Sequence, residues 1–221
     1  MQRTIFTLII VLFSFNLWAD NFSAERLTRV RSGSRENVSQ LLWVKASNDV
    51  TSVAQLWEYK EGQWQSIGDE FDVSVGTKGT TKSKREGDGE TPEGIFSLNE
   101  LFGRGPRQNL KMPYRALTAA DKWIDDAEHA DYNTFVQGAT TARSYEDLLR
   151  EDGQYDLFAV VGYNMNPIIP GNGSAIFVHI WSGPGNPTAG CVAMERDNME
   201  RFARFLDREK NPHILIGELR R

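Results

Sequence analysis

The sequence has little that supports metal or disulfide chemistry. Among its 221 residues there is one cysteine, Cys191, and there are three histidines. A single cysteine excludes an internal disulfide, and without an HExxH motif or a cluster of ligands at zinc-site spacing we expect no metal and no other cofactor. The GxSxG motif of a serine nucleophile is also missing. The thiol is therefore the residue whose role most needs an explanation.

The chain also lacks an excess of positive charge. It has 25 basic and 30 acidic side chains, a formal net charge of −5. Residues 1–19 contain one arginine and no acid, so the rest of the chain carries −6. This charge excludes a general attraction to nucleic acid, and the basic clusters at 26–31 and 78–85 are interpreted as solvated loops. With 40% hydrophobic and 25% charged residues, the composition is that of a soluble globular protein.

Apolar runs long enough to cross a membrane are missing after the first residues. A short basic start, Met1 to Thr4, precedes an almost continuously apolar stretch, Ile5 to Phe15. Leu17-Trp18-Ala19 then places a small residue at the expected cleavage site. This pattern predicts a secretory signal peptide over 1–19, with an uncleaved membrane anchor as the alternative. We expect the mature chain to be periplasmic and soluble.

Residues 20–40 are polar and are interpreted as a linker or N-terminal arm, and residues 41–221 as one domain. Within the domain, alternating and β-branched segments predict a mainly β fold with a few helices. Strands are expected at 41–44, 52–59, 64–67, 71–75, 157–163, 175–181 and 214–216. Helices are expected at 144–149, after a capping Ser144, and at about 195–209. Residues 76–94 are expected to form a long glycine-rich loop.

Cys191 lies twelve residues after His179, which is placed at the end of an apolar strand. Three roles compete for the lone thiol: a buried apolar residue, an intermolecular disulfide, or a nucleophile. His179 could equally be a core histidine with satisfied hydrogen bonds. Two glycines and two prolines between 181 and 187 suit a chain reversal that brings imidazole and thiol together. An imidazole near a thiol accepts its proton and stabilises the thiolate, which favours the nucleophile.

These residues lie in a pattern that resembles the L,D-transpeptidase catalytic domain of the YkuD type. Val178-His179, the segment Thr188-Ala189-Gly190-Cys191-Val192 and the upstream Thr91-Pro92-Glu93-Gly94-Ile95-Phe96 carry the resemblance. The stretch from Tyr163 to His179 and Trp123-Ile124-Asp125-Asp126 resemble one branch of the family. The likeness covers roughly residues 42–217. It implies an L,D-transpeptidase-like β-sandwich with a groove that holds Cys and His.

The resemblance also implies roles for individual residues. Cys191 would attack a carbonyl of a wall tetrapeptide and form a thioester, with His179 as general base and acid. The backbone carbonyl of Ile180 would orient His179, and the backbone amides of Gly190 and Cys191 would bind the oxyanion. Trp181, Thr188 and Asn164 are taken as substrate-binding residues.

Two departures from the family pattern bear on the reaction. The position before Gly190 is Ala189, where the family usually has His, and Ala193 replaces a polar residue two positions after the cysteine. Peptidoglycan L,D-transpeptidation of stem peptides is the leading hypothesis. The alternatives are a cysteine hydrolase of the same fold, acting as an L,D-carboxypeptidase or as an amidase on peptidoglycan or a wall-lipoprotein link, and a non-catalytic wall-binding protein. No nucleic-acid partner is expected.

Overall fold

Strands rich in β-branched and aromatic residues form most of the regular structure, as their composition favours. The computed structural model describes residues 27–28, 37–46 and 49–218. The strands are β1 (Gln40–Lys45), β2 (Thr51–Lys60), β3 (Gln63–Ser74), β4 (Thr80–Thr81), β5 (Thr91–Pro92), β6 (Gly94–Gly103), β7 (Tyr114–Ala116), β8 (Asp121–Ile124), β9 (Phe135–Gln137), β10 (Tyr145–Asp147), β11 (Leu157–Val161), β12 (Phe177–Ile180), β13 (Val192–Met194) and β14 (Pro212–Ile216). Helix α2 (Arg196–Phe205) and a short 3-10 helix (Arg208–Lys210) precede the last strand. The mainly β prediction is confirmed.

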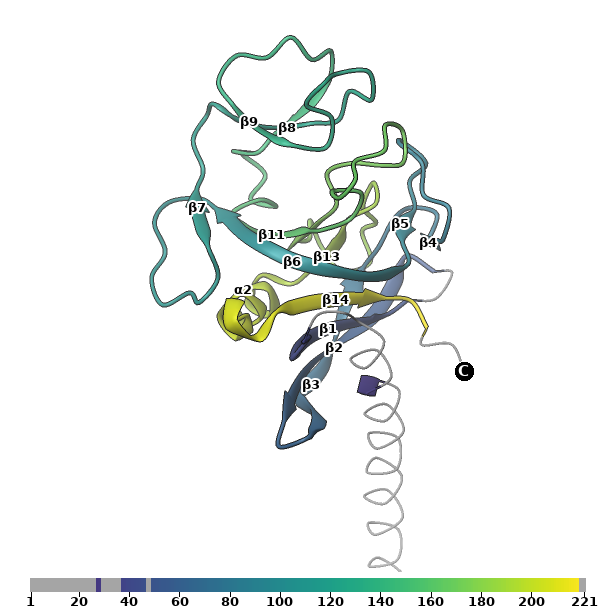
Figure 1. Ribbon diagram of the computed structural model, residues 1–221, viewed down its shortest axis with the longest axis vertical. Coiled ribbons are helices and arrows are strands. Elements are labelled where there is room, and N and C mark those ends of the chain that lie inside the picture. Colours follow the sequence, from purple (N-terminus) through teal and green to yellow (C-terminus); the bar gives the residue numbers. More distant parts are fainter. Residues whose placement is uncertain (1–26, 29–36, 47–48, 219–221) are drawn as a thin grey trace, which may run out of the picture.

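The largest sheet closes on itself. Its strands follow the order β11-β12-β13-β3-β2-β1-β14-β6-β7, and β6 also pairs with β11. The strands from β11 to β6 therefore form a closed ring, so the two layers of the expected sandwich are joined along this edge. In Figure 1 the long strand β6 runs across the molecule between β11 and β14.

Apolar side chains from every strand of this ring fill its interior. They form one buried cluster, to which α2 adds Met199, Phe202 and Ala203. These three residues lie on one face of the helix at the spacing of an amphipathic helix, and its charged residues lie on the other. Val178 and Ile180 of β12 belong to this inner cluster, so their neighbours along the strand must point outward.

A second layer covers the outer face of β11 and β12. Residues 104–156 contain the small sheet β10-β8-β9, which Figure 1 shows at the top of the molecule, beyond β6 and β11. Between this layer and the ring lies a second buried cluster that is rich in aromatic residues and includes Trp123, Tyr155, Phe158, Phe177 and Cys191. Burying a large apolar side chain stabilises the fold by roughly 1.5–3 kcal/mol. The outer layer therefore packs firmly on the strand that carries His179.

Some of the sequence predictions need correction. The expected helix at 144–149 is wrong: Tyr145–Asp147 forms β10, which pairs with β8. The helix expected at 195–209 ends earlier, at Phe205, and the chain then makes a separate 3-10 turn. His213 is buried in β14, between β1 and β6.

The predicted signal peptide over 1–19 lies outside the described residues, as does most of the arm over 20–40. Within the described part of that arm, Leu27 is fully buried in a third cluster with Trp43, Trp57 and Trp64. Among the residues that the structure describes, there is no helix whose length and apolar character would let it cross a membrane.

Candidate active site

Cys191 and His179 lie on the same face of two adjacent parallel strands. Strand β12 pairs with β13 so that His179 lies opposite Ala193, and Cys191 comes immediately before β13. Side chains alternate between the faces of a strand, so Cys191 and Ala193 point the same way as Phe177 and His179. This is the outer face, under the second layer. The residue opposite His179 on the neighbouring strand is the small Ala193.

Cys191 lines a cavity, and the residue is 7% exposed. Its Sγ donates to the backbone oxygen of Ala175 at 3.3 Å and accepts from the N–H of Phe177 at 3.4 Å. The cavity has a volume of about 160 Å³. It is lined by Lys84, Glu86, Gly87, Asp125, Glu146, Ser174, Ala175, Ile176, Ala189, Gly190 and Cys191. One wall of the nucleophile's cavity is thus built from carboxylates.

Burial, more than any nearby charge, keeps the thiol protonated. Burial raises the pKa of Cys191 to about 12, and the negative charge of Glu146 acts in the same direction. Burial also raises the pKa of Glu146, an effect that the hydrogen bond from the hydroxyl of Tyr155 opposes. A charged carboxylate would disfavour a thiolate nearby, so the resting thiol is neutral over the physiological pH range.

His179 is held by its own strand. Its Nδ1 lies 2.8 Å from the backbone oxygen of Ile180. A carbonyl only accepts hydrogen bonds, so Nδ1 carries the proton and Nε2 has a free lone pair. The ring packs against Tyr155 at a centroid distance of 5.3 Å in an edge arrangement. Burial lowers the pKa of His179 to about 4 although the Ile180 contact opposes this shift, so the imidazole is neutral at physiological pH.

No hydrogen bond joins His179 to Cys191 within the part of the chain that the structure describes. The hydrogen-bonding groups of the thiol are instead Ala175 and Phe177, as given above. Catalytic hydrogen bonds are often long without substrate and form when it binds. The arrangement is therefore that of a neutral thiol and a neutral imidazole, not of a preformed ion pair.

The loop before Cys191 is fixed by Thr188. Its Oγ1 donates to the backbone oxygen of Cys191 at 2.7 Å and accepts from the N–H of Gly190 at 3.1 Å. The hydroxyl of Thr91 donates to the same oxygen of Cys191 at 3.2 Å. The N–H of Gly190, which the sequence interpretation assigns to the oxyanion, is thus already used. Its role as a donor stays a prediction and requires the bond to Thr188 to break.

Gly190 is required by its backbone conformation and by its close neighbours. Its φ is 150°, in the region that side chains rarely adopt, and a Cβ there would lie 3.0 Å from the backbone oxygen of Glu90. Gly190→Ala is expected to lower the free energy of unfolding by about 1–3 kcal/mol, visible as a Tm lower by several degrees. The matched control is Gly185→Ala, where φ is 74° but the nearest atom would be 3.8 Å away. Equal losses in both variants would refute the role of close packing.

Trp181 and Asn164 are the remaining residues predicted to bind substrate. They line neither the Cys191 cavity nor a neighbouring cavity between the loop 76–94 and the loop after β11. Trp181 is half-buried, and its backbone N–H donates to the backbone oxygen of Met194. The side chain of Asn164 donates to the backbone oxygens of Ile169 and Gly173, and its Oδ1 accepts from the N–H of Ile169. Both residues shape loops near the site, and their contact with substrate stays a prediction.

Sequence reasoning did not identify the carboxylates around the thiol. Glu86 comes from the long loop, Asp125 follows β8 and Glu146 lies in β10. Asp125 belongs to a segment that carries the family resemblance, but the resemblance implies no role for it. Glu146 lies in the segment 144–149, for which the sequence predicts a helix and the structure has β10. Within the described residues, no group of three His, Cys, Asp or Glu side chains is arranged to hold a metal ion.

A buried thiol and an oriented imidazole on one face of a closed β-sheet define a β-rich protein with a cysteine–histidine site. The model of one protein family, described as the YkuD L,D-transpeptidase catalytic domain, matches residues 43–214. The chain belongs to this family.

The fold is similar to that of the helical cell shape determining protein Pgp2 from Campylobacter jejuni, with a TM-score of 0.49 and 14% sequence identity. The similarity covers 89% of this chain, which spans 56% of the Pgp2 chain. No curated protein matches the sequence.

Proposed function

We propose that the protein is a cysteine acyltransferase that acts on the tetrapeptide stems of peptidoglycan as an L,D-transpeptidase. The observation that carries the proposal is the position of Cys191, in the lining of a cavity and on the same face as an imidazole whose Nε2 is free. Membership of the L,D-transpeptidase family supports the choice of substrate. Export directed by residues 1–19, which is a further proposal, would bring the enzyme to the wall.

The first half of the reaction forms a thioester. The S–H of Cys191 turns from Ala175 toward His179, which takes the proton on Nε2 as sulfur adds to the substrate carbonyl. The oxygen of that carbonyl becomes an oxyanion, to which the backbone N–H of Cys191 would donate. When the tetrahedral intermediate collapses, the C–N bond breaks and the departing amine takes the proton from the imidazolium. The products are the thioester and a free amino acid.

The second half of the reaction returns the thiol. An amine of another stem peptide, or water, gives a proton to His179 and attacks the thioester carbonyl. Sulfur leaves and regains a proton from the imidazolium. Transfer gives a new amide bond and hydrolysis gives a shortened peptide. Hydrolysis needs only water at the thioester, which makes an L,D-carboxypeptidase the second candidate.

Product analysis separates these reactions. We expect purified protein incubated with tetrapeptide-bearing muropeptides to yield products that mass spectrometry identifies as cross-linked or residue-exchanged. Tripeptides alone would favour the carboxypeptidase. Release of a peptide from a wall-lipoprotein conjugate would favour the amidase. Muropeptides that stay unchanged throughout would contradict the proposal and favour a non-catalytic wall-binding protein.

A further inference from the structure

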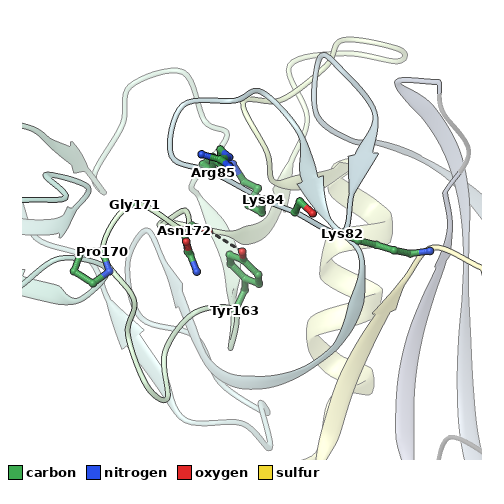
Figure 2. A pocket seen from close by; sticks show the side chains of 8 residues that line it. Lys82, Lys84, Arg85, Tyr163, Pro170, Gly171 and Asn172 are labelled. Atoms are coloured by element: carbon green, nitrogen blue, oxygen red, sulfur yellow. Dashed lines mark hydrogen bonds between the residues drawn. The ribbon is translucent and has the colours of Figure 1, made fainter.

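A second and larger cavity adjoins the one that contains Cys191. Its volume is about 500 Å³, and it lies between the long loop 76–94 and the loop after β11. Lys82, Ser83, Lys84 and Arg85 line one side, and Tyr163, Pro170, Gly171 and Asn172 line the other. Figure 2 shows Arg85 and Lys84 on the loop opposite Asn172 and Tyr163, with the ammonium of Lys82 directed away. The walls of this cavity contain basic side chains and no acidic ones.

Two of the three cations are already neutralised. The ammonium of Lys82 is 3.3 Å from Glu93, and that of Lys84 is 2.5 Å from Asp88. The guanidinium of Arg85 forms no ion pair or hydrogen bond with any residue that the structure describes. The cavity therefore has one uncompensated positive charge, which suits a ligand group with a single negative charge.

The turn that carries Arg85 is rigid. The carboxylate of Asp88 accepts hydrogen bonds from the ammonium of Lys84 and from the backbone amides of Arg85 and Glu90. Burial raises the pKa of Asp88, but these donors outweigh it and hold the pKa below its usual value. The backbone of the turn is therefore ordered before a ligand binds, and the conformational entropy lost on binding is that of the exposed Arg85 side chain.

Lys84 is shared by the two cavities. It lines both of them, and its Cε would lie 3.4 Å from a Cβ at Gly190, the residue before the nucleophile. On the Cys191 side the charged groups are mainly carboxylates, and on the other side they are cations. A carboxylate of the substrate is repelled from the first cavity and attracted to the second.

We propose that the cavity around Arg85 binds the free α-carboxylate of the amino acid on the amine side of the reacting bond. This inference rests on the proposed acyl transfer at Cys191. The amino acid that leaves and the amine that replaces it meet the same carbonyl carbon from the same side, because acylation and aminolysis are one reaction run in opposite directions. One subsite thus serves the departing residue and an incoming amino acid.

The neutral residues of the cavity suit this ligand. The side-chain amide of Asn172 is exposed and supplies N–H donors to a carboxylate. The hydroxyl of Tyr163 is held by the backbone oxygen of Asn172 at 2.7 Å, which fixes the ring as an apolar wall. A ligand with a carboxamide in place of the α-carboxylate would have nearly the same shape but no negative charge. Comparing the acid with the amide therefore isolates the contribution of Arg85.

The first test measures the departing residue. Two tetrapeptide-stem substrates, ending in D-alanine or in D-alaninamide, are compared by kcat/KM. We expect the wild type to prefer the acid by about tenfold, the usual effect of a hydrogen bond to a charged group. Arg85→Gln is expected to remove the preference and Arg85→Lys to retain most of it. Lys78→Gln, which removes an exposed cation from the same loop outside the cavity, should leave the ratio unchanged.

The second test measures the incoming residue, with D-methionine and D-methioninamide as acceptors in an exchange reaction. A preference for the acid that depends on Arg85 supports the shared subsite. If acid and amide differ in the first test but not in the second, the subsite binds only the departing residue, and the inference of a shared subsite is overturned. Equal use of acid and amide by an active wild type overturns the inference and leaves the proposed function intact. A wild type that processes neither peptide overturns both.

Discussion

Cys191→Ala is expected to lower the turnover of muropeptides by about 10⁴-fold or more. Among the described residues, the thiol of Cys191 is the group in the cavity that can form a thioester, because the chain has no other cysteine. Removing it leaves water as the remaining nucleophile for the substrate carbonyl. The measurement is the rate of tripeptide and cross-link formation, followed by mass spectrometry with wild type and variant at equal concentrations.

The fold should survive this substitution. Cys191 packs in the outer cluster but makes only weak sulfur hydrogen bonds, to Ala175 and from Phe177. Cys191→Ser is the matched control, since its hydroxyl can keep both contacts while being a far poorer nucleophile without further activation. Both variants should retain the wild-type circular dichroism spectrum. Substantial activity in Cys191→Ala would contradict covalent catalysis by this residue.

The central strands could be predicted from the sequence because the same apolar residues favour a strand locally and are the ones that the core buries. The segments around Val160 and Val178 are rich in β-branched and aromatic residues and lie in β11 and β12. The loop between them returns the chain so that β13 runs parallel to β12, and this pairing brings His179 and Cys191 to one face. The candidate pair therefore follows from strand preference and from the position of the intervening turn.

Tertiary pairing explains the part of the fold that could not be predicted. The pattern from Ser144 to Leu149 fits one helical face, yet Tyr145 to Asp147 pairs with β8. A segment of six residues contains too little periodicity to separate the two structures, so its neighbours determine the outcome. The same pairing brings Glu146 to the Cys191 cavity. Its part in the electrostatics of the thiol was therefore invisible in the sequence.

Hydrogen bonds from side chains to the backbone were equally hidden. Thr188 and Asn164 were assigned to substrate because they lie near the motif, and both hold loops together. Asn133 does the same: its Oδ1 accepts from Trp123 and from the N–H of Ala175, the residue whose oxygen contacts Cys191. Spacing along the chain reveals which residues are close but not which polar groups are already satisfied.

His179→Gln is expected to lower kcat by about 10²–10⁴-fold, the contribution of a general base. Glutamine can still hydrogen-bond to the oxygen of Ile180, but its amide does not accept a proton near neutral pH. The matched control is His129→Gln, which removes an imidazole that contacts Thr141 and lines neither cavity. The control should keep wild-type kcat and Tm. Equal losses in both variants would attribute the effect to stability.

The pH profile of kcat/KM tests the state of His179 directly. Burial lowers its pKa to about 4, so the imidazole stays a base at pH 5 and above and is lost as the pH falls through about 4. The thiol, with a pKa raised to about 12, stays protonated until far above neutral pH. We expect a flat profile from about pH 5 to 8 and an acid limb near 4, matched by the titration of His179 in NMR spectra. An acid limb near 6.5, the usual value for histidine, would contradict the buried neutral imidazole and favour a thiolate–imidazolium pair.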